Sequence, residues 1–264
     1  METSNVGRVA IGKKHYVRAP EPIHFPSEES PEEHVGETKR HLEARTTLYL
    51  LLKSLLAGRA VGSEQFMYWD ASDPRKCLSP DVFVKLGAPE ETFDTWKIWE
   101  RGAPDIAVEI VSASDRRDDD WEEKMARYRA TGIGEVLRFD PESAQQPVRT
   151  WDRVDGDLVE RAPESTHLRE CSALGLWWVV VPSQYGPLLR LARDREGRDL
   201  LPTPDEKQMR MAQELAEERK ARTLAEHERM LADHARRQVE RERDDALAEI
   251  ERLKAELARL RDGR

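Results

Sequence analysis

The sequence has little cysteine and no long apolar run, and both shortages exclude whole classes of protein. Only two of its 264 residues are cysteines, Cys77 and Cys171, too few for a disulfide framework or a four-thiolate zinc site. The small number of cysteines favours a reducing, cytoplasmic setting. No run of about 18 apolar residues is present, so we expect no membrane span. Residues 1–20 lack the continuous apolar segment of a secretory signal.

An excess of positive charge is also missing. The chain has 52 acidic residues against 43 lysines and arginines, a formal net charge of -9. This balance argues against a protein that coats nucleic acid electrostatically, but it leaves room for an enzyme that engages nucleic acid through a local patch. Charged residues make up 36% of the chain, against about 25% in average soluble domains. We therefore expect a long, highly charged segment in addition to a domain with an apolar core of ordinary composition.

That polar segment is 205–264, which contains no proline and no aromatic residue. Such a composition predicts one long helix. Apolar residues recur every seven positions and between those positions, at Val239, Ala246, Ile250, Leu253 and Leu257. Arg243 interrupts the seam, and Leu224 and Leu231 lie outside its frame, so the repeat is imperfect. We predict a coiled-coil helix that forms a homo-oligomer; a solvated helix without a partner is the alternative.

The remaining residues divide into an N-terminal arm, 1–34, and a domain, 35–204. The arm is punctuated by prolines, and all seven tryptophans lie before the C-terminal helix. Apolar periodicity predicts helices at 41–56 and 121–131. It predicts strands at 62–69, 80–86, 105–111, 135–139, 148–151, 158–161, 176–181 and 188–192. Residues 91–101 read as a polar insert, and Asp155-Gly156 as a hairpin turn. The order indicates a mixed α/β (α+β) domain.

Two charged residues lie in apolar surroundings on consecutive elements. Glu109 is in the middle of the apolar strand 105–111. The following helix has an apolar stripe formed by Trp121, Met125 and Tyr128. Lys124 lies inside this stripe, where a lysine is costly unless its ammonium is paired or reaches water. Glu109 and Lys124 can therefore meet, either as functional groups or as a purely structural ion pair.

Three further residues are weaker candidates. Asp81 follows Pro80 at the start of an apolar strand, where an aspartate is often only a turn or strand-start residue. Asp105 shares a strand face with Glu109 at a distance of about 13 Å, which favours strand capping over binding of the same ion. His41, on the first helix, is either a boundary residue or a helper of the site.

Three segments follow one another in the order of a known set of motifs. They are SPDVFVKL (79–86), APDIAVEIVSASD (103–115) and DDWEEKMARYRATGIGEVLRFDPE (119–142). They resemble the motifs of the Uma-type family of putative restriction endonucleases, in the PD-(D/E)XK nuclease superfamily. The likeness covers roughly residues 35–190 and includes the helix that carries His41.

The resemblance implies a restriction-endonuclease-like core, a mixed sheet flanked by helices. It assigns Asp81 and Glu109 as catalytic residues and ligands of Mg²⁺ (or Mn²⁺), and Lys124 as the catalytic lysine. Superfamily members usually carry this lysine two residues after the acid, where this chain has Val111. The acidic stretch before the first helix of many members is poorly matched, and Glu37 is the plausible substitute.

These residue types suit phosphodiester hydrolysis. Two carboxylates can hold a hard cation through oxygen ligands while leaving water sites open, and the cation lowers the pKa of its bound water. Lys124 would orient that water or stabilise the developing charge. We therefore predict a metal-dependent endonuclease acting on DNA. The alternative is a catalytically inactive nuclease-fold module that acts in oligomerisation or partner binding through the coiled coil, which the acidic balance favours.

Overall fold

The computed structural model describes residues 23–26, 37–112, 118–163 and 165–262. Contacts between residues divide the chain into two compact units, Met1–Leu201 and Pro202–Arg264. Most of the arm predicted for 1–34 lies outside the described residues.

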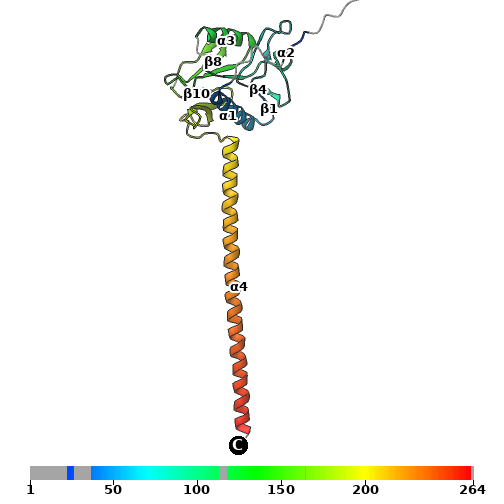
Figure 1. The fold of residues 1–264 in the computed structure, drawn as a ribbon, viewed down its shortest axis with the longest axis vertical. Helices are drawn as coiled ribbons and strands as arrows, with labels where there is room; N and C mark the ends of the chain where they lie inside the picture. Colours follow the sequence, from blue (N-terminus) through cyan, green and yellow to red (C-terminus); the bar gives the residue numbers. More distant parts are fainter. Residues whose placement is uncertain (1–22, 27–36, 113–117, 164, 263–264) are drawn as a thin grey trace, which may run out of the picture. The chain divides into compact units, whose positions relative to one another are not determined.

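A six-stranded mixed sheet is the centre of the globular unit (Figure 1). Its strands, in spatial order, are β1 (Arg59–Gly62), β4 (Val82–Pro89), β6 (Ile106–Ile110), β7 (Glu135–Phe139), β8 (Val148–Val154) and β9 (Asp157–Glu160). Within this sheet, only β6 and β7 run parallel, and α3 (Asp118–Thr131) connects them. Every other neighbouring pair in this sheet is antiparallel. The predicted mixed sheet flanked by helices is thus confirmed.

Two three-stranded sheets complete the unit. One contains β10 (Leu168–Cys171), β11 (Leu176–Val181) and β12 (Leu188–Ala192); the other contains β3 (Cys77–Leu78), β2 (Met67–Tyr68) and β5 (Trp96–Lys97). β5 and the short α2 (Ile98–Arg101) lie in the segment predicted as a polar insert. That prediction is wrong for Trp96, which is fully buried and packs edge-on against Phe83 at 5.3 Å between ring centroids. Its ring contributes to the core although most neighbouring residues in the chain are polar.

The two faces of the large sheet carry separate cores because side chains alternate along each strand. On one face, Ile106, Val108 and Ile110 pack with α1 (Lys39–Leu55) and with β10–β12. On the other face, Ala107 packs with the predicted stripe of α3, formed by Trp121, Met125 and Tyr128. Glu109 belongs to this second face, so the α3 stripe and Glu109 lie on the same side of the sheet.

The hairpin predicted at Asp155-Gly156 joins β8 to β9. Asp155 has φ 49° and Gly156 has φ 87°. Positive φ at both central residues is the requirement of a type I′ turn, whose twist matches that of the paired strands. An aspartate tolerates this conformation and a glycine adopts it without steric cost, so the hairpin prediction is confirmed.

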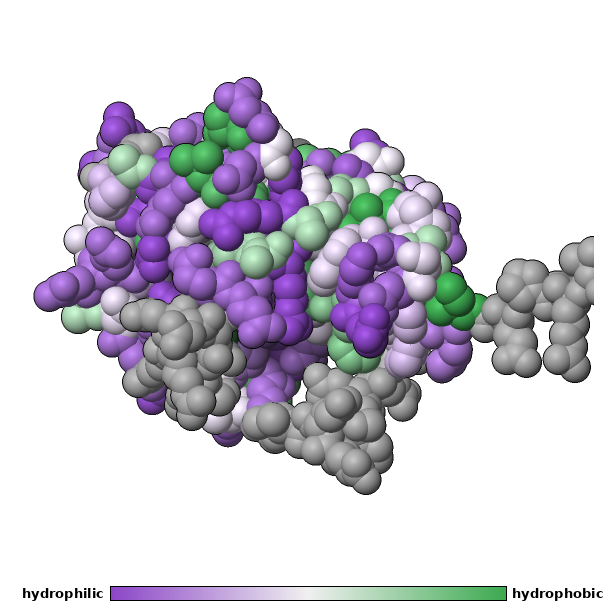
Figure 2. All heavy atoms as spheres, turned by 90° about the horizontal axis from the view of Figure 1, so that it is seen from above, coloured by the Kyte–Doolittle hydropathy of each residue, from purple (hydrophilic) through white to green (hydrophobic). Residues whose placement is uncertain are grey.

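The surface of the globular unit is mostly hydrophilic on the face drawn in Figure 2, where hydrophobic residues form small separate patches. Scattered apolar residues of this kind are ordinary on soluble surfaces and do not by themselves mark a docking site. The apolar side chains that require an explanation lie instead on the C-terminal helix.

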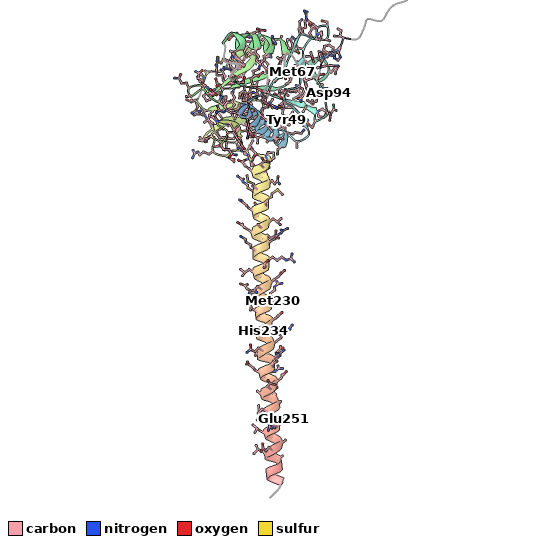
Figure 3. The ribbon with its side chains drawn as sticks, viewed as in Figure 1. Tyr49, Met67, Asp94, Met230, His234 and Glu251 are labelled. Atoms are coloured by element: carbon pink, nitrogen blue, oxygen red, sulfur yellow. The ribbon has the colours of Figure 1, made fainter. Side chains whose placement is uncertain are left out.

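The second unit is a single helix, α4 (Pro204–Asp262), of 59 residues and about 90 Å in length at 1.5 Å per residue. It begins with a capping box: Thr203 N–H donates to Glu206 Oε2 (2.8 Å), and Glu206 N–H donates to Thr203 Oγ1 (3.2 Å). Pro204 occupies the first helical position, where its missing N–H costs nothing. Side chains project from the helix all round, among them Met230, His234 and Glu251 (Figure 3). Within the described residues, no helix combines the length and the apolar character needed to cross a bilayer.

Candidate active site

The pairing of β4 with β6 brings Asp81 and Glu109 together. Val82 pairs with Val108 in the antiparallel ladder, and continuing this register by one residue sets Asp81 opposite Glu109. Residues opposite each other in such a ladder project from the same face of the sheet. Both carboxylates are buried, with Asp81 8% and Glu109 4% exposed. Burial of two acids side by side is costly unless cations or hydrogen-bond donors compensate.

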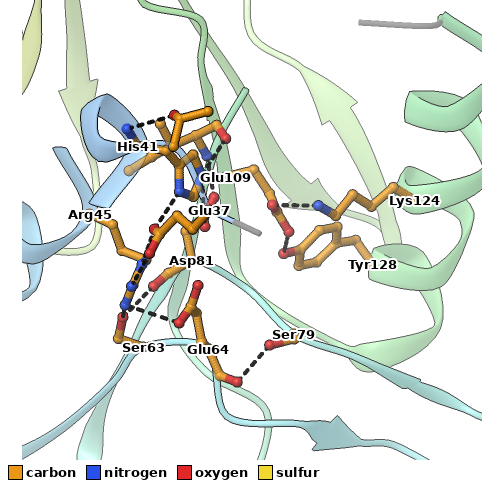
Figure 4. Close-up of polar contacts among 12 residues, drawn as sticks. Glu37, His41, Arg45, Ser63, Glu64, Ser79, Asp81, Glu109, Lys124 and Tyr128 are labelled. Atoms are coloured by element: carbon orange, nitrogen blue, oxygen red, sulfur yellow. Dashed lines mark hydrogen bonds and ion pairs between the residues drawn. The ribbon is translucent and has the colours of Figure 1, made fainter. Parts of the chain in front are cut away.

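Helix α3 supplies the compensation for Glu109 (Figure 4). Lys124 Nζ lies 2.6 Å from Glu109 Oε2, and the Tyr128 hydroxyl donates to Glu109 Oε1. The lysine side chain is 33% exposed, against 5% for that of Glu109. The contact between Glu109 and Lys124, which the sequence indicated as possible, is therefore present. Lys124 bridges the buried carboxylate and the solvent.

The position of Glu109 shifts its protonation equilibrium. Burial is the main cause and raises the pKa of Glu109 to about 7, with a further increase from the charge of Asp81. The charge of Lys124 and the hydrogen bonds from Lys124 and Tyr128 oppose this rise. A carboxyl group with a pKa near neutrality in a charged cluster is typical of functional sites. The same burial, together with the charge of Glu109, raises the pKa of Tyr128, which keeps its hydroxyl a donor.

Asp81 is held at the end of the sheet by donors from two elements. Its Oδ2 accepts from the backbone N–H of Ile110 at 2.6 Å. His41, from the first turn of α1, places Nε2 3.2 Å from Asp81 Oδ1 and 3.0 Å from the carbonyl oxygen of Ile110. The histidine ring therefore contacts the aspartate and the strand that carries Glu109. Of the two readings offered for His41, the geometry favours a helper of the site.

A second layer of charge orients His41. Glu37 Oε1 lies 2.7 Å from His41 Nδ1, and Arg45 donates to both oxygens of Glu37, at 3.0 and 2.9 Å. Arg45 also donates to Ser63 Oγ at 3.1 Å, and Ser63 donates in turn to the carbonyl of Asp81 at 2.8 Å. His41 and Arg45 lie four residues apart on one face of α1, and Glu37, two residues before the helix begins at Lys39, contacts both. That spacing is the sequence signal by which Arg45 could have been found.

His41 is expected to make the folding stability depend on pH. Burial lowers its pKa, but the hydrogen bonds and charges of Asp81 and Glu37 outweigh burial and raise it to about 9, from 6.5. Because the folded-state value is the higher one, His41 stabilises the protein fully below pH 6.5, and this contribution is lost as the pH rises through 9. Chemical denaturation of His41→Gln should show a deficit in unfolding free energy of about 2–3 kcal/mol at pH 6 that shrinks by pH 9.5.

The control for this prediction is His167→Gln, which changes an exposed histidine. Its deficit should be small at both pH values. A deficit in His41→Gln that stays constant between pH 6 and 9.5 would contradict the ion pair with Asp81.

The oxygens around Asp81 and Glu109 suit a hard divalent cation in their chemistry. Two carboxylates and the carbonyl of Ile110 form an oxygen-only set, the kind that Mg²⁺ and Mn²⁺ prefer. The Nε2 of His41 already lies against Asp81 and this carbonyl, so positive charge is stabilised at this point. Among the described residues no group of three or more histidine, cysteine, aspartate or glutamate side chains is placed to hold a metal. Water would have to supply the remaining ligands, as is usual for Mg²⁺.

A cavity of about 290 Å³ lies beside this cluster. It is lined by Thr38, Arg40, His41, Ala44, Ile110, Val111, Ser112, Pro141 and Glu142. The lining includes the residues that follow the parallel strands β6 and β7, and ligands of α/β sheets commonly bind outside the carboxyl ends of such strands. The cavity thus gives access to His41 and Ile110 from solvent.

Asp105 lies apart from this cluster. Its Oδ2 accepts from the backbone N–H of Leu86 at 2.7 Å, and its Oδ1 pairs with Lys85 at 3.2 Å. These contacts fasten Asp105 to the neighbouring strand, the structural role that its distance from Glu109 favoured.

Comparison with known protein families gives a match over residues 22–182 to the family Uma2, described as "Putative restriction endonuclease". The match covers more than half of the 264 residues. The chain belongs to this family. Membership in the Uma2 family confirms the resemblance drawn from the three motif segments and supports a nuclease of the restriction-endonuclease type. A search of curated proteins gave no match.

A solved structure similar to this Uma2-family chain is described as a putative nuclease belonging to DUF820 from Anabaena variabilis ATCC 29413. It is 17% identical, with 48% of this chain and 74% of that chain covered, at a TM-score of 0.31. Membership in the family rests on the match to Uma2 alone.

Proposed function

We propose that this protein is a metal-dependent endonuclease that hydrolyses phosphodiester bonds in DNA. The observation that carries the proposal is the cluster in which buried Asp81, directly before β4, lies opposite buried Glu109 of β6, with the Lys124 ammonium 2.6 Å from Glu109. An ion pair that served only the fold would need neither the second buried acid nor the histidine held against it. Family membership supports the same reaction class.

Asp81 and Glu109 would hold Mg²⁺ or Mn²⁺, together with the carbonyl oxygen of Ile110. When bound, the cation would polarise the phosphodiester and lower the pKa of its bound water. Lys124 would orient the attacking water or stabilise the charge that develops on the phosphoryl oxygens, since its ammonium reaches from Glu109 toward solvent.

The other residues of the cluster would act by positioning these three. Tyr128 fixes one oxygen of Glu109 and leaves the other for Lys124. His41 orients Asp81, and Glu37 orients His41. Such support from neighbouring hydrogen bonds is what keeps catalytic groups in their productive geometry.

Cleavage of supercoiled plasmid DNA by the purified full-length chain tests the proposal. Nicked and linear products are expected with Mn²⁺ or Mg²⁺, and none with a chelator, because two buried acids without a cation repel the phosphate backbone. The matched control is the Asp81→Asn variant, which keeps the shape of the side chain and removes its charge. Metal-independent cleavage, or equal cleavage by Asp81→Asn, would contradict the proposal.

We also propose that α4 mediates self-association of the chain. Its apolar residues, among them Ile250, Leu253 and Leu257, are 48%, 50% and 66% exposed, and burying them against another helix is favourable. This property is shared with the alternative function, a catalytically inactive nuclease fold that acts through its helix. The two functions are separated by the plasmid assay, since the alternative predicts no metal-dependent cleavage.

A further inference from the structure

We infer that α4 pairs with α4 of a second copy of the chain as a parallel, in-register, two-stranded coiled coil. This inference rests on the self-association proposed above and adds the orientation, the alignment and the number of chains. It is carried by the positions of charged and apolar residues along one uninterrupted helix.

The continuity of α4 from Pro204 to Asp262 allows a single seven-residue frame abcdefg. Position d is occupied by Ala225, Ala232, Val239, Ala246 and Leu253. Position a is occupied by Arg222, Arg229, Arg236, Arg243, Ile250 and Leu257. The apparent skip in the apolar repeat disappears once the small residues Ala225 and Ala232 are counted in the seam. All of these side chains are exposed in the single chain, so the whole seam is available to a partner.

The residues of the seam favour two strands. Ile250 at position a is followed by Leu253 at position d, the combination that selects dimers among parallel coiled coils. Ala246 at position d brings the backbones close together. Charged residues at position a, such as Arg243, are tolerated best in a dimer, where their heads can reach water at the edge of the seam.

The same residues fix the alignment of the two copies. In register, Arg243 lies beside Arg243 of the second copy, and its head can reach Glu242 of that copy, while Ile250 and Leu257 meet their own counterparts. A slip by one heptad would place Arg243 against Ile250 of the second copy and leave apolar surface unmatched. The change from arginines to apolar residues along position a, between Arg243 and Ile250, thus sets the register, as polar residues at a positions do in other coiled coils.

The charges that flank the seam fix the orientation. Glu242, Glu249 and Glu256 occupy position g, and Lys254 occupies position e. In a parallel pair, g of one helix faces e of the next heptad on the other, so Glu249 meets Lys254 of the second copy, and the reverse contact forms by symmetry. In an antiparallel pair, g faces g, so the contact between Glu249 and Lys254 would be lost.

Contacts within the single helix do not compete strongly with this arrangement. Lys254 pairs with Glu251 at 2.9 Å, and Arg252 with Glu249 at 3.7 Å, all with side chains at least 57% exposed. Exposed pairs of this kind contribute little to stability. Lys254 and Glu249 can therefore exchange these partners for each other across the coiled coil.

The orientation has a consequence for the nuclease. Both helices begin at Pro204 and follow directly on the globular unit. A parallel pair therefore brings two globular units, and two Asp81-Glu109-Lys124 clusters, to the same end of the coiled coil. An antiparallel pair would separate them by up to the length of the helix, about 90 Å.

Single cysteines in the full-length chain test the inference. The background is Cys77→Ser, which removes the partly exposed native thiol and leaves the buried Cys171. Val239→Cys and Ala246→Cys, both at position d, should each form an intermolecular disulfide on oxidation, because like d positions in a parallel pair come close enough for one. The matched control Ala248→Cys lies at position f, on the outer side, and should stay reduced.

Light scattering of the same variants separates the two proposals. A monomer overturns self-association and this inference together. A dimer in which Val239→Cys and Ala246→Cys do not both cross-link overturns only the parallel, in-register arrangement, because an antiparallel pair can bring at most one of these positions against itself.

Charge reversal supplies an independent measurement. Lys254→Glu should weaken dimerisation about tenfold, because each of two symmetric attractions becomes a repulsion. The double variant Glu249→Lys with Lys254→Glu should restore the affinity of the native chain. Circular dichroism would verify that the helix content is unchanged. A Lys254→Glu variant that dimerises as tightly as the native chain would overturn the assigned orientation.

Discussion

Replacement of Lys124 by methionine is expected to lower the rate of DNA cleavage by about 1000-fold, the effect of removing one preorganised charge-stabilising group from an active site. The methionine retains an unbranched apolar side chain and removes the ammonium that lies 2.6 Å from Glu109. Rates measured with saturating Mn²⁺ on a short labelled duplex would give the loss directly. Tyr128 still donates to Glu109, and the buried carboxyl group can take up a proton, so the variant should still fold, which circular dichroism would verify.

The matched control for this prediction is Arg127→Met. Arg127 lies on the same helix and pairs with Glu123 at the surface, with side chains 51% and 68% exposed. Its removal should leave the cleavage rate unchanged. Equal rates for Lys124→Met and the native chain would exclude Lys124 from the chemistry and leave only its ion pair.

Glu109→Gln is expected to abolish cleavage and yet to stabilise the fold at alkaline pH. Glutamine cannot supply the charge of a cation ligand, so the cleavage rate should fall by at least about 100-fold. Burial raises the pKa of Glu109 to about 7 from 4.5, so the carboxyl group destabilises the folded state progressively as the pH rises from 4.5 to 7. The neutral amide removes this cost, and denaturation at pH 8 should show a gain of about 1–3 kcal/mol.

Glu135→Gln separates the catalytic part of this prediction from the stability part. Glu135 is another buried glutamate, 3% exposed on the neighbouring strand β7, where it accepts from the Trp178 indole at 3.2 Å. Burial raises its pKa as well, so its amide variant should also be stabilised at pH 8, but it should cleave DNA at the native rate. A Glu109→Gln variant that retains cleavage would contradict the proposed role of Glu109.

The elements with a strong local pattern were predictable from the sequence. The β7, β11 and β12 strands were predicted with the bounds that the structure has, because each is a short apolar run between turn residues. The stripe on α3 placed Lys124 on the packed face, where its charge required a partner nearby. The nuclease family was recognisable because three motif segments occur in order.

The parts set by long-range contacts were not predictable in the same way. The register between β4 and β6, which sets Asp81 opposite Glu109, depends on strand pairing across the intervening α2 segment. Trp96 lies in a mostly polar segment of the chain. Its burial depends on the pairing of β5 with β2, which are far apart in the sequence. Arg45 was missed because its link to His41 runs through Glu37. Only the structure shows that Glu37 contacts both side chains.

A crystal of the full-length protein soaked in Mn²⁺ and measured with anomalous scattering tests the central claim most directly. The account predicts a manganese peak in contact with the carboxylates of Asp81 and Glu109, absent from crystals of Asp81→Ala. Manganese bound only elsewhere, or a peak that survives in Asp81→Ala, would contradict a catalytic cation at this cluster.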